Sequence, residues 1–179
     1  MTGQKKKGLS AVIATVGLLL MTIVAVTILI AFIVPFVRNN LDESTACLDY
    51  GEYFFFNEKF NFNCYEIGGT QKVYYLSVGA KTVENSTGKE VEGFKLVFYS
   101  NDMSSTKDVT TGDSPVTFNG GIYMLNNETE TIKIPNPGET RTYVYNTTGV
   151  FSEAEVYVKL KSGKVCSDLS DSVIIGRCS

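Results

Sequence analysis

Histidine and tryptophan are both absent from the 179-residue chain, and proline and cysteine each occur only four times. Histidine is the side chain that most often serves as general base and as metal ligand near neutral pH. Its absence argues against most hydrolytic and metal-dependent active sites, and no other residue pattern in the chain matches a catalytic motif. We therefore expect a protein that is not an enzyme and that uses neither a cofactor nor a metal ion.

Positive charge is also scarce. The chain has 16 Lys and Arg against 19 Asp and Glu, a formal net charge of -3, and three of the lysines are the consecutive Lys5–Lys7. Everything after these lysines is therefore more acidic than the chain as a whole. An acidic surface repels a phosphate backbone, so we expect no nucleic-acid partner.

One long apolar run stands out in this sequence. From Ala11 to Val37 no side chain carries a charge. As a helix this run measures roughly 40 Å, against roughly 30 Å for the hydrocarbon core of a bilayer. Because Lys5–Lys7 precede the run and Arg38 begins a polar, acidic stretch, the positive-inside tendency predicts a cytoplasmic N-terminus and an extracellular remainder.

A secretory signal peptide is the first alternative for this segment. The apolar region of a signal peptide is about 7–15 residues long and ends at a small-residue cleavage site. Here the apolar run is about twice as long, and no Ala-x-Ala pattern closes it. Cleavage behind the run is therefore not expected, whereas cleavage in front of it, at Gly8–Leu9, fits the sequence better.

The residues around Gly8 carry a family resemblance. Lys-Lys-Lys-Gly followed by Leu-Ser-Ala-Val-Ile-Ala-Thr-Val resembles the leader and helix start of archaeal-type IV pilins and archaellins, over about the first 38 residues. The resemblance implies that a membrane aspartic peptidase cleaves after Gly8, that Leu9 becomes the N-terminus, and that the apolar helix packs in a filament core. Bacterial pilins mostly have a glutamate at the fifth mature position, where this chain has Ile13, so the resemblance is to the archaeal branch.

After Tyr50 the chain consists of short β-type runs separated by Gly, Asn, Asp and Pro. The clearest is Glu155–Lys161, in which Val156, Val158 and Leu160 face inward. Seven or eight such strands without an amphipathic helix predict an antiparallel β-sandwich, immunoglobulin-like in type, behind a long helix: an α+β chain. Other predicted strands cover 60–64, 73–78, 94–98, 143–145 and 173–175, with turns at 68–69 and 135–138, and 100–113 is a loop or weak edge strand. The expected divisions are a leader (1–8), a helix (9–45) and an outer domain (46–179).

All four cysteines, Cys47, Cys64, Cys166 and Cys178, lie beyond the apolar run. In an oxidising exterior an even number of cysteines indicates two disulfides, with three possible connectivities. We favour Cys47–Cys64 with Cys166–Cys178, because each bond then closes a short loop. A zinc site is a weaker alternative, since the chain lacks histidine and a Cys-x-x-Cys motif.

Three Asn-x-Ser/Thr sequons also lie on the predicted outer side, and each is a candidate for N-glycosylation. They begin at Asn85, Asn127 and Asn146.

These features lead to two functional hypotheses. In the first, the chain is the structural subunit of an extracellular type IV pilus-like filament that serves adhesion. Its precursor resides in the membrane, and its partners are copies of itself, the prepilin-type peptidase and the assembly machinery. In the second, it is a single-pass membrane protein that keeps its anchor and displays a β-sandwich binding domain. The N-terminus of the mature protein distinguishes the two.

Overall fold

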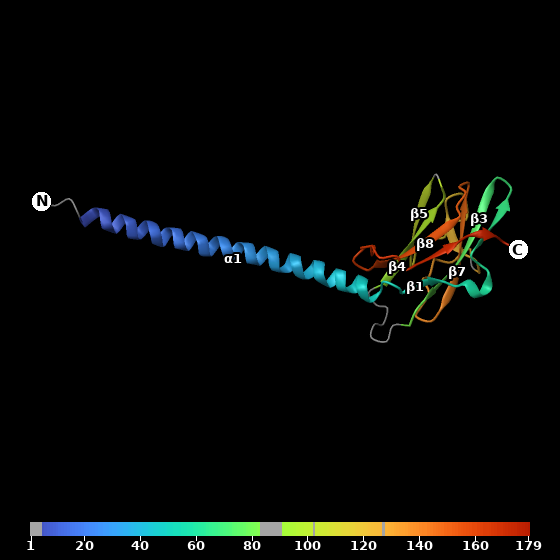
Figure 1. Ribbon diagram of the computed structural model, residues 1–179, viewed down its shortest axis with the longest axis horizontal. Helices are drawn as coiled ribbons and strands as arrows, with labels where there is room; N and C mark the ends of the chain where they lie inside the picture. The colour runs from blue at the N-terminus through green and yellow to red at the C-terminus, as the bar shows by residue number, and fades with distance from the viewer. Residues whose placement is uncertain (1–4, 83–90, 102, 127) are drawn as a thin grey trace. The chain divides into compact units, whose positions relative to one another are not determined.

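The computed structural model describes residues 5–82, 91–101, 103–126 and 128–179. It divides into two compact units, Met1–Thr45 and Ala46–Ser179. The first unit holds nearly all of one helix, α1, which runs from Lys5 to Asp49. The second unit, here called the head, contains the strands and the last turn of α1 (Figure 1).

Helix α1 is longer than predicted. The predicted helix ends at residue 45, where the sequence becomes polar. The observed helix continues through Pro35 and past residue 45, and it ends at Asp49. The physical reason lies in the head, where Cys47 and Tyr50 are both buried. Burial of these two side chains stabilises a last helical turn that the local sequence alone does not favour.

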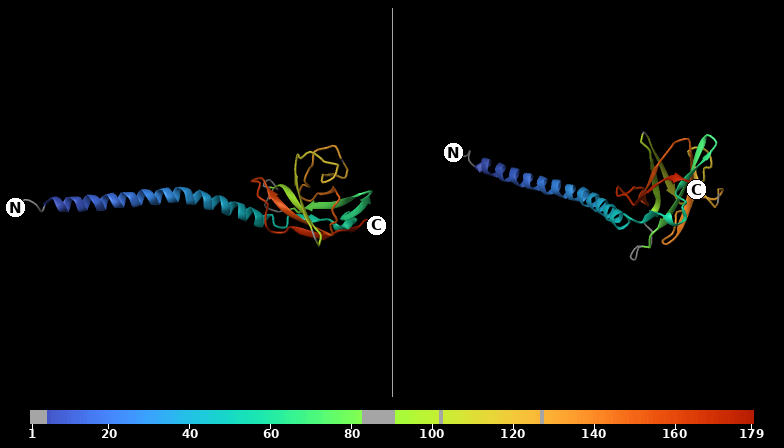
Figure 2. Two further views of the ribbon diagram at one scale, coloured as in Figure 1. Left: turned by 90° about the horizontal axis from the view of Figure 1, so that it is seen from above. Right: turned by 45° about the vertical axis from the view of Figure 1, so that its right-hand side comes forward.

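The head is built from two sheets that are almost entirely antiparallel. The six-stranded sheet has the order β10-β2-β3-β7-β6, with β1 paired to the far end of β3, and the four-stranded sheet has the order β5-β4-β8-β9. Figures 1 and 2 show β3 and β7 on one side of the head and β4, β5 and β8 on the other. The strands are β1 (Phe54–Phe56), β2 (Cys64–Gly68), β3 (Gln71–Ala80), β4 (Val91–Tyr99), β5 (Ser104–Thr110), β6 (Ile122–Met124), β7 (Thr140–Thr147), β8 (Glu153–Leu160), β9 (Asp171–Ile174) and β10 (Gly176–Arg177).

The core lies between the two sheets and is rich in aromatic rings. Alternating residues of β4 and β8 point into it as predicted, with Phe94, Leu96, Phe98, Val156 and Val158 all fully buried. From the six-stranded sheet, Tyr74 and Tyr145 contact Phe98, and Tyr143 contacts Phe94. Rings from both sheets therefore share one core, which is what holds the sheets together.

The buried tyrosines keep their hydroxyls satisfied. The Tyr143 hydroxyl donates to the Lys133 carbonyl over 2.7 Å, and the Tyr74 hydroxyl accepts from the Phe151 N–H over 2.7 Å. Burial raises the pKa of both phenols, so both stay neutral at physiological pH.

The predicted strand over 60–64 is wrong for most of its length. Glu58–Phe60 form a short 3-10 helix, Asn61 adopts a left-handed conformation with φ of 50°, and β2 begins only at Cys64. The Asn57 side chain accepts from the Lys59 N–H and so caps this turn. The alternation of Phe and Asn imitates a strand, but asparagine side chains that bond the local backbone favour a turn instead.

The end of the chain connects the two sheets. Strand β9 pairs with β8 in one sheet, and one residue later β10 pairs in parallel with β2 of the other. The Asp171 carboxylate accepts from the Phe56 N–H over 2.8 Å and joins β9 to β1. This crossing places Cys178 beside β2, where the Cys178 N–H donates to the Tyr65 carbonyl.

Candidate functional site: apolar helix and disulfide framework

The apolar part of α1 is long enough to cross a membrane. The span Ile13–Arg38 has 26 residues and a mean hydropathy of 2.9, and none of its most apolar window is buried within the structure. At 1.5 Å per residue it measures about 39 Å, more than the roughly 30 Å of bilayer hydrocarbon. With its position near the N-terminus, this helix indicates membrane anchoring or secretion.

Two threonine hydroxyls inside this span, those of Thr22 and Thr27, are satisfied by the helix itself. Thr22 donates to the Leu19 carbonyl and Thr27 to the Val24 carbonyl, each over 2.8 Å. In lipid or in a dry helix bundle an unpaired hydroxyl is costly, so these bonds make both residues compatible with an apolar environment.

A shallow apolar groove runs along α1 at Gly17. A Cβ built on Gly17 meets no atom within 4 Å, so the absence of a side chain there leaves an open notch in the helix surface. Small residues let a neighbouring helix approach closely where hydrophobic burial provides little gain. The groove is lined by Gly17, Leu18, Leu20, Met21, Thr22, Val24, Ala25 and Ile28.

The expected cleavage site lies at the start of the same helix. α1 begins at Lys5, so the Gly8–Leu9 bond lies in its first turns. Glycine is a weak helix former, and frayed helix ends open readily, so this bond is one at which the backbone can become extended. Ile13, the fifth residue counted from Leu9, is 65% exposed.

Both disulfides are present, but the favoured pairing was wrong. Cys47 bonds Cys166, and Cys64 bonds Cys178, with Cα–Cα distances of 5.4 and 5.0 Å. The favoured pairing followed loop length alone. The strand order decides otherwise, because the parallel pairing of β10 with β2 aligns Gly176 with Cys64 and brings Cys178 to its side.

The bond between Cys47 and Cys166 attaches the last turn of α1 to the connection between β8 and β9. Both cysteines are at least nine-tenths buried, and Cys166 is held further by its N–H, which donates to the Val158 carbonyl. The two bonds have sequence separations of 119 and 114 residues, so each encloses most of the head. Disulfides of this kind indicate an oxidising, extracellular location.

The structure describes only one of the three sequons. Asn85 and Asn127 lie outside the described residues, whereas Asn146 lies in β7 and is 8% exposed. Its Nδ2, the atom that would carry a glycan, donates to the Thr117 carbonyl over 2.6 Å. In the folded head this nitrogen is thus buried and already bonded, which disfavours a glycan at Asn146.

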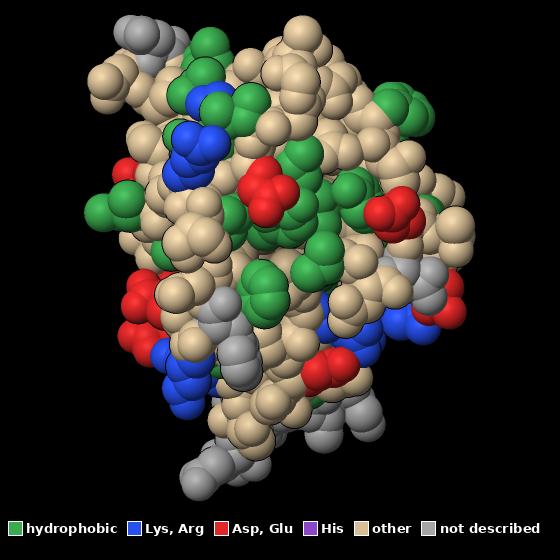
Figure 3. Space-filling view, turned by 90° about the vertical axis from the view of Figure 1, so that its right-hand side faces the viewer, with side chains coloured by type: hydrophobic (Ala, Val, Ile, Leu, Met, Phe, Trp, Pro, Cys, Tyr) green, Lys and Arg blue, Asp and Glu red, His purple; other side chains and the backbone are tan. Residues whose placement is uncertain are grey.

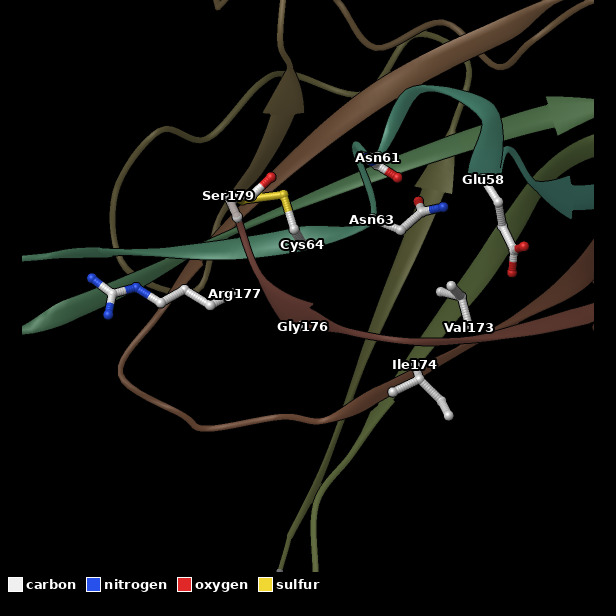
Figure 4. A pocket seen from close by; sticks show the side chains of 10 residues that line it. Glu58, Asn61, Asn63, Cys64, Val173, Ile174, Gly176, Arg177 and Ser179 are labelled. Carbon is white, nitrogen blue, oxygen red and sulfur yellow. A yellow bond between two sulfur atoms is a disulfide. The ribbon is translucent and has the colours of Figure 1, made fainter.

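Two hollows flank the Cys64–Cys178 disulfide, and sequence reasoning predicted neither. The first lies along β9 and β10, where the side chains of Glu58 and Asn63 lie on one wall and Arg177 points away (Figure 4). Its lining comprises Glu58, Asn61, Asn63, Cys64, Val173, Ile174, Gly176, Arg177, Cys178 and Ser179. The second, which we call the Phe62 hollow, has a volume of about 440 Å³ and is lined by Asn61, Phe62, Cys64, Glu66, Tyr75, Leu125, Cys178 and Ser179.

Within the part of the chain that the structure describes, no group of three or more Cys, Asp or Glu side chains is placed to hold a metal ion. Asp108, one of the acidic residues of the head, instead pairs with Lys95 and Lys159 across three strands.

No protein-family model, curated protein or solved structure matches this chain.

Proposed function

We propose that the chain is the structural subunit of an extracellular, archaeal-type IV pilus-like filament that serves adhesion to surfaces. Residues 1–8 are the leader, and the helix from Leu9 is the assembly element. The observation that carries the proposal is the order of the N-terminal features: three lysines, Gly8, and then an apolar helix that continues without a charge to Arg38.

Assembly of this kind requires the helix to leave lipid for a bundle of its neighbours. Both surroundings are apolar, so the exchange gains little hydrophobic free energy, and the gain must come from close packing repeated along the fibre. The notch at Gly17 and the satisfied hydroxyls of Thr22 and Thr27 support this proposal, since both suit a tightly packed, dry bundle.

In the proposed filament the head faces the outside. Its two disulfides and acidic composition suit that location, and Asn85 and Asn127 remain the proposed glycosylation sites. The finer assignment of the head to the immunoglobulin-like sandwiches is also part of this proposal. It is supported by two largely antiparallel sheets with a shared aromatic core.

The experiment that tests the proposal determines the N-terminus of the protein taken from the cell envelope. We expect a start at Leu9 in cells with an active prepilin-type peptidase and a start at Met1 or Thr2 in cells without it. Gly8→Ile should block processing, whereas Gly3→Ile, in the same leader but away from the junction, should leave it intact.

A mature protein that keeps residues 1–8 in the presence of the peptidase contradicts the proposal and leaves the single-pass anchored protein as the better hypothesis. Where processing occurs, sheared surface material examined by electron cryo-microscopy should contain filaments with α1 at the axis. Processed protein that remains in the membrane and yields no filament contradicts the structural-subunit role.

A further inference from the structure

The outer face of the six-stranded sheet carries a row of aromatic side chains. The strand register places Cys64, Tyr75, Val144 and Tyr123 side by side on four neighbouring strands. Val144 faces away from the core, because Tyr143 and Tyr145 on either side of it point inward. It is nevertheless fully buried. Its two neighbours in the row are Tyr75 and Tyr123, so we infer that their rings cover it.

The Phe62 hollow lies at one end of this row. Its lining includes Phe62, which is 44% exposed, the Cys64–Cys178 disulfide and Tyr75. Figure 3 looks onto this side of the head and shows a central patch of apolar side chains with acidic side chains beside it. An exposed, concave apolar patch with a polar rim is typical of a binding site.

The walls of the hollow are rigid before any ligand arrives. Asn63 holds the segment that carries Phe62 in place through two hydrogen bonds. Its side chain donates to the Asn57 carbonyl over 3.0 Å and accepts from the N–H of Ser77 in β3 over 2.8 Å. The opposite wall is fixed by the disulfide and by β10. A preformed site of this kind loses little conformational entropy when it binds.

The polar groups of the hollow are acceptors and neutral hydroxyls. The Tyr75 hydroxyl donates to one oxygen of the Glu66 carboxylate over 3.3 Å, and a carboxylate has further lone pairs that can accept from other donors. Burial, together with Glu66, raises the pKa of Tyr75, so its hydroxyl stays neutral. The lining residues include a carboxylate and no Lys or Arg, which disfavours an anionic ligand.

Size favours a small ligand over a second copy of the chain. A stable protein–protein interface uses about 20–30 residues on each side. The hollow is lined by eight residues. A neutral sugar ring fits this chemistry, because its C–H face packs on Tyr and Phe rings while its hydroxyls donate to a carboxylate.

We propose that the Phe62 hollow binds a neutral glycan chain, with a sugar ring packed between Phe62 and Tyr75 and a hydroxyl donated to Glu66. This assignment requires only that the head lies outside the cell, which holds for the filament subunit and for the anchored protein alike. It therefore stands or falls independently of filament assembly.

The test uses the oxidised full-length chain in detergent micelles. The probes are cellotetraose, chitotetraose and a mannose tetrasaccharide as neutral glycans, a galacturonic acid tetramer as an anionic glycan, and tetralysine as a cationic peptide. Binding is measured by isothermal titration calorimetry. We expect saturable binding of at least one neutral tetrasaccharide and none of the galacturonic acid tetramer.

Phe62→Ala and Glu66→Gln should each weaken this binding by about tenfold or more, which corresponds to the loss of one ring contact or one charge-assisted hydrogen bond. Both residues are exposed, so neither substitution should impair folding. The matched control is Tyr157→Ala, on the outer face of the other sheet, where the Tyr157 hydroxyl donates to Glu155 in a similar tyrosine–carboxylate pair. The affinity of Tyr157→Ala for the neutral tetrasaccharide should equal that of the parent protein.

Three results overturn the proposal. They are the absence of neutral-glycan binding up to about 10 mM, a preference for tetralysine over every neutral probe, and equal loss of affinity in Tyr157→Ala and Phe62→Ala. Because the assay needs no filament, a failure here leaves the proposed function untouched.

Discussion

Removal of the disulfides gives the sharpest prediction about the head. Each bond closes a loop of well over 100 residues. By the loop-entropy relation either bond alone stabilises the fold by about 5 kcal/mol. The two loops overlap, however, so their contributions are not independent.

With Cys47–Cys166 closed, the shortest path from Cys64 to Cys178 runs through that bond. This path covers the 17 residues from Cys64 back to Cys47 and, after the disulfide, the 12 residues from Cys166 on to Cys178. A ring of about 30 residues gives only about 3.6 kcal/mol by the same relation. The same ring of about 30 residues forms whichever bond closes second, so removing either bond from the intact protein should cost about 3.6 kcal/mol. Removing both should cost about 8.5 kcal/mol.

The variants are Cys47→Ala with Cys166→Ala, Cys64→Ala with Cys178→Ala, and the quadruple replacement. Urea unfolding of the full chain in micelles, followed by tyrosine fluorescence because tryptophan is absent, measures their stability. With a slope of about 2 kcal/mol per molar urea, each double variant should lose roughly 1.8 M in midpoint. The quadruple variant should lose about 1.3 kcal/mol more than the two double variants combined.

Two results refute this reasoning. One is a double variant whose midpoint lies within about 0.5 M of the parent, which would mean that the enclosed loop does not set the stability. The other is a non-reducing peptide map in which the Cys47 peptide is joined to the Cys64 peptide, since short loops predict a combined contribution of only about 6 kcal/mol. A map that joins Cys47 to Cys166 is the expected result.

Three further predictions concern the helix and the titrating groups of the head. Gly17→Leu should fill the notch in α1 and abolish filaments in electron micrographs. Its membrane insertion, measured by carbonate extraction, should persist. Gly17→Ala is the control that should still assemble. Tyr143→Phe should cost about 1–2 kcal/mol at pH 7, because the Lys133 carbonyl loses its buried donor. Burial raises the pKa of Tyr143 above its ordinary value of 10, so the parent should lose stability as pH rises beyond 10. Tyr143→Phe, which has no phenol at this position, should lose less stability over the same range. Urea midpoints of both proteins at pH 7 and about 11 measure the difference. Glu139→Gln should cost less than about 1 kcal/mol at pH 7, because this carboxylate is largely solvated. The Asn136 N–H lowers the pKa of Glu139 below its ordinary value of 4.5. This contribution is therefore present above pH 4.5 and is lost as pH falls through the lowered pKa, below which parent and variant should unfold alike.

Each of these predictions has a contradicting outcome. Filaments from Gly17→Leu would show that the notch is not a helix contact. A parent and a Tyr143→Phe variant with the same decline above pH 10 would show that this phenol does not link stability to pH. A Glu139→Gln deficit that does not shrink as the pH is lowered below 4.5 would assign the effect to something other than the ionised carboxylate.

Several features follow from the sequence by itself, because they depend on neighbours along the chain. Charge-free residues from Ala11 to Val37 have few alternatives to an apolar helix. Alternation in 94–98 and 155–161 sets which side chains face the core, since a strand turns successive residues to opposite faces. The turn at 136–139 is likewise local, with the Glu139 N–H donating to the Asn136 carbonyl and Gly138 at φ of 81°.

Only the tertiary structure decided what joins distant segments. The cysteine pairing depends on β10 lying beside β2, a contact between residues more than 100 positions apart that loop length cannot predict. The burial of Asn146 depends on the segment around Thr117 folding over β7, so the sequon alone looked accessible. The Phe62 hollow likewise requires four separate segments to meet, and Tyr75 is placed in it by strand register, a property of the whole sheet.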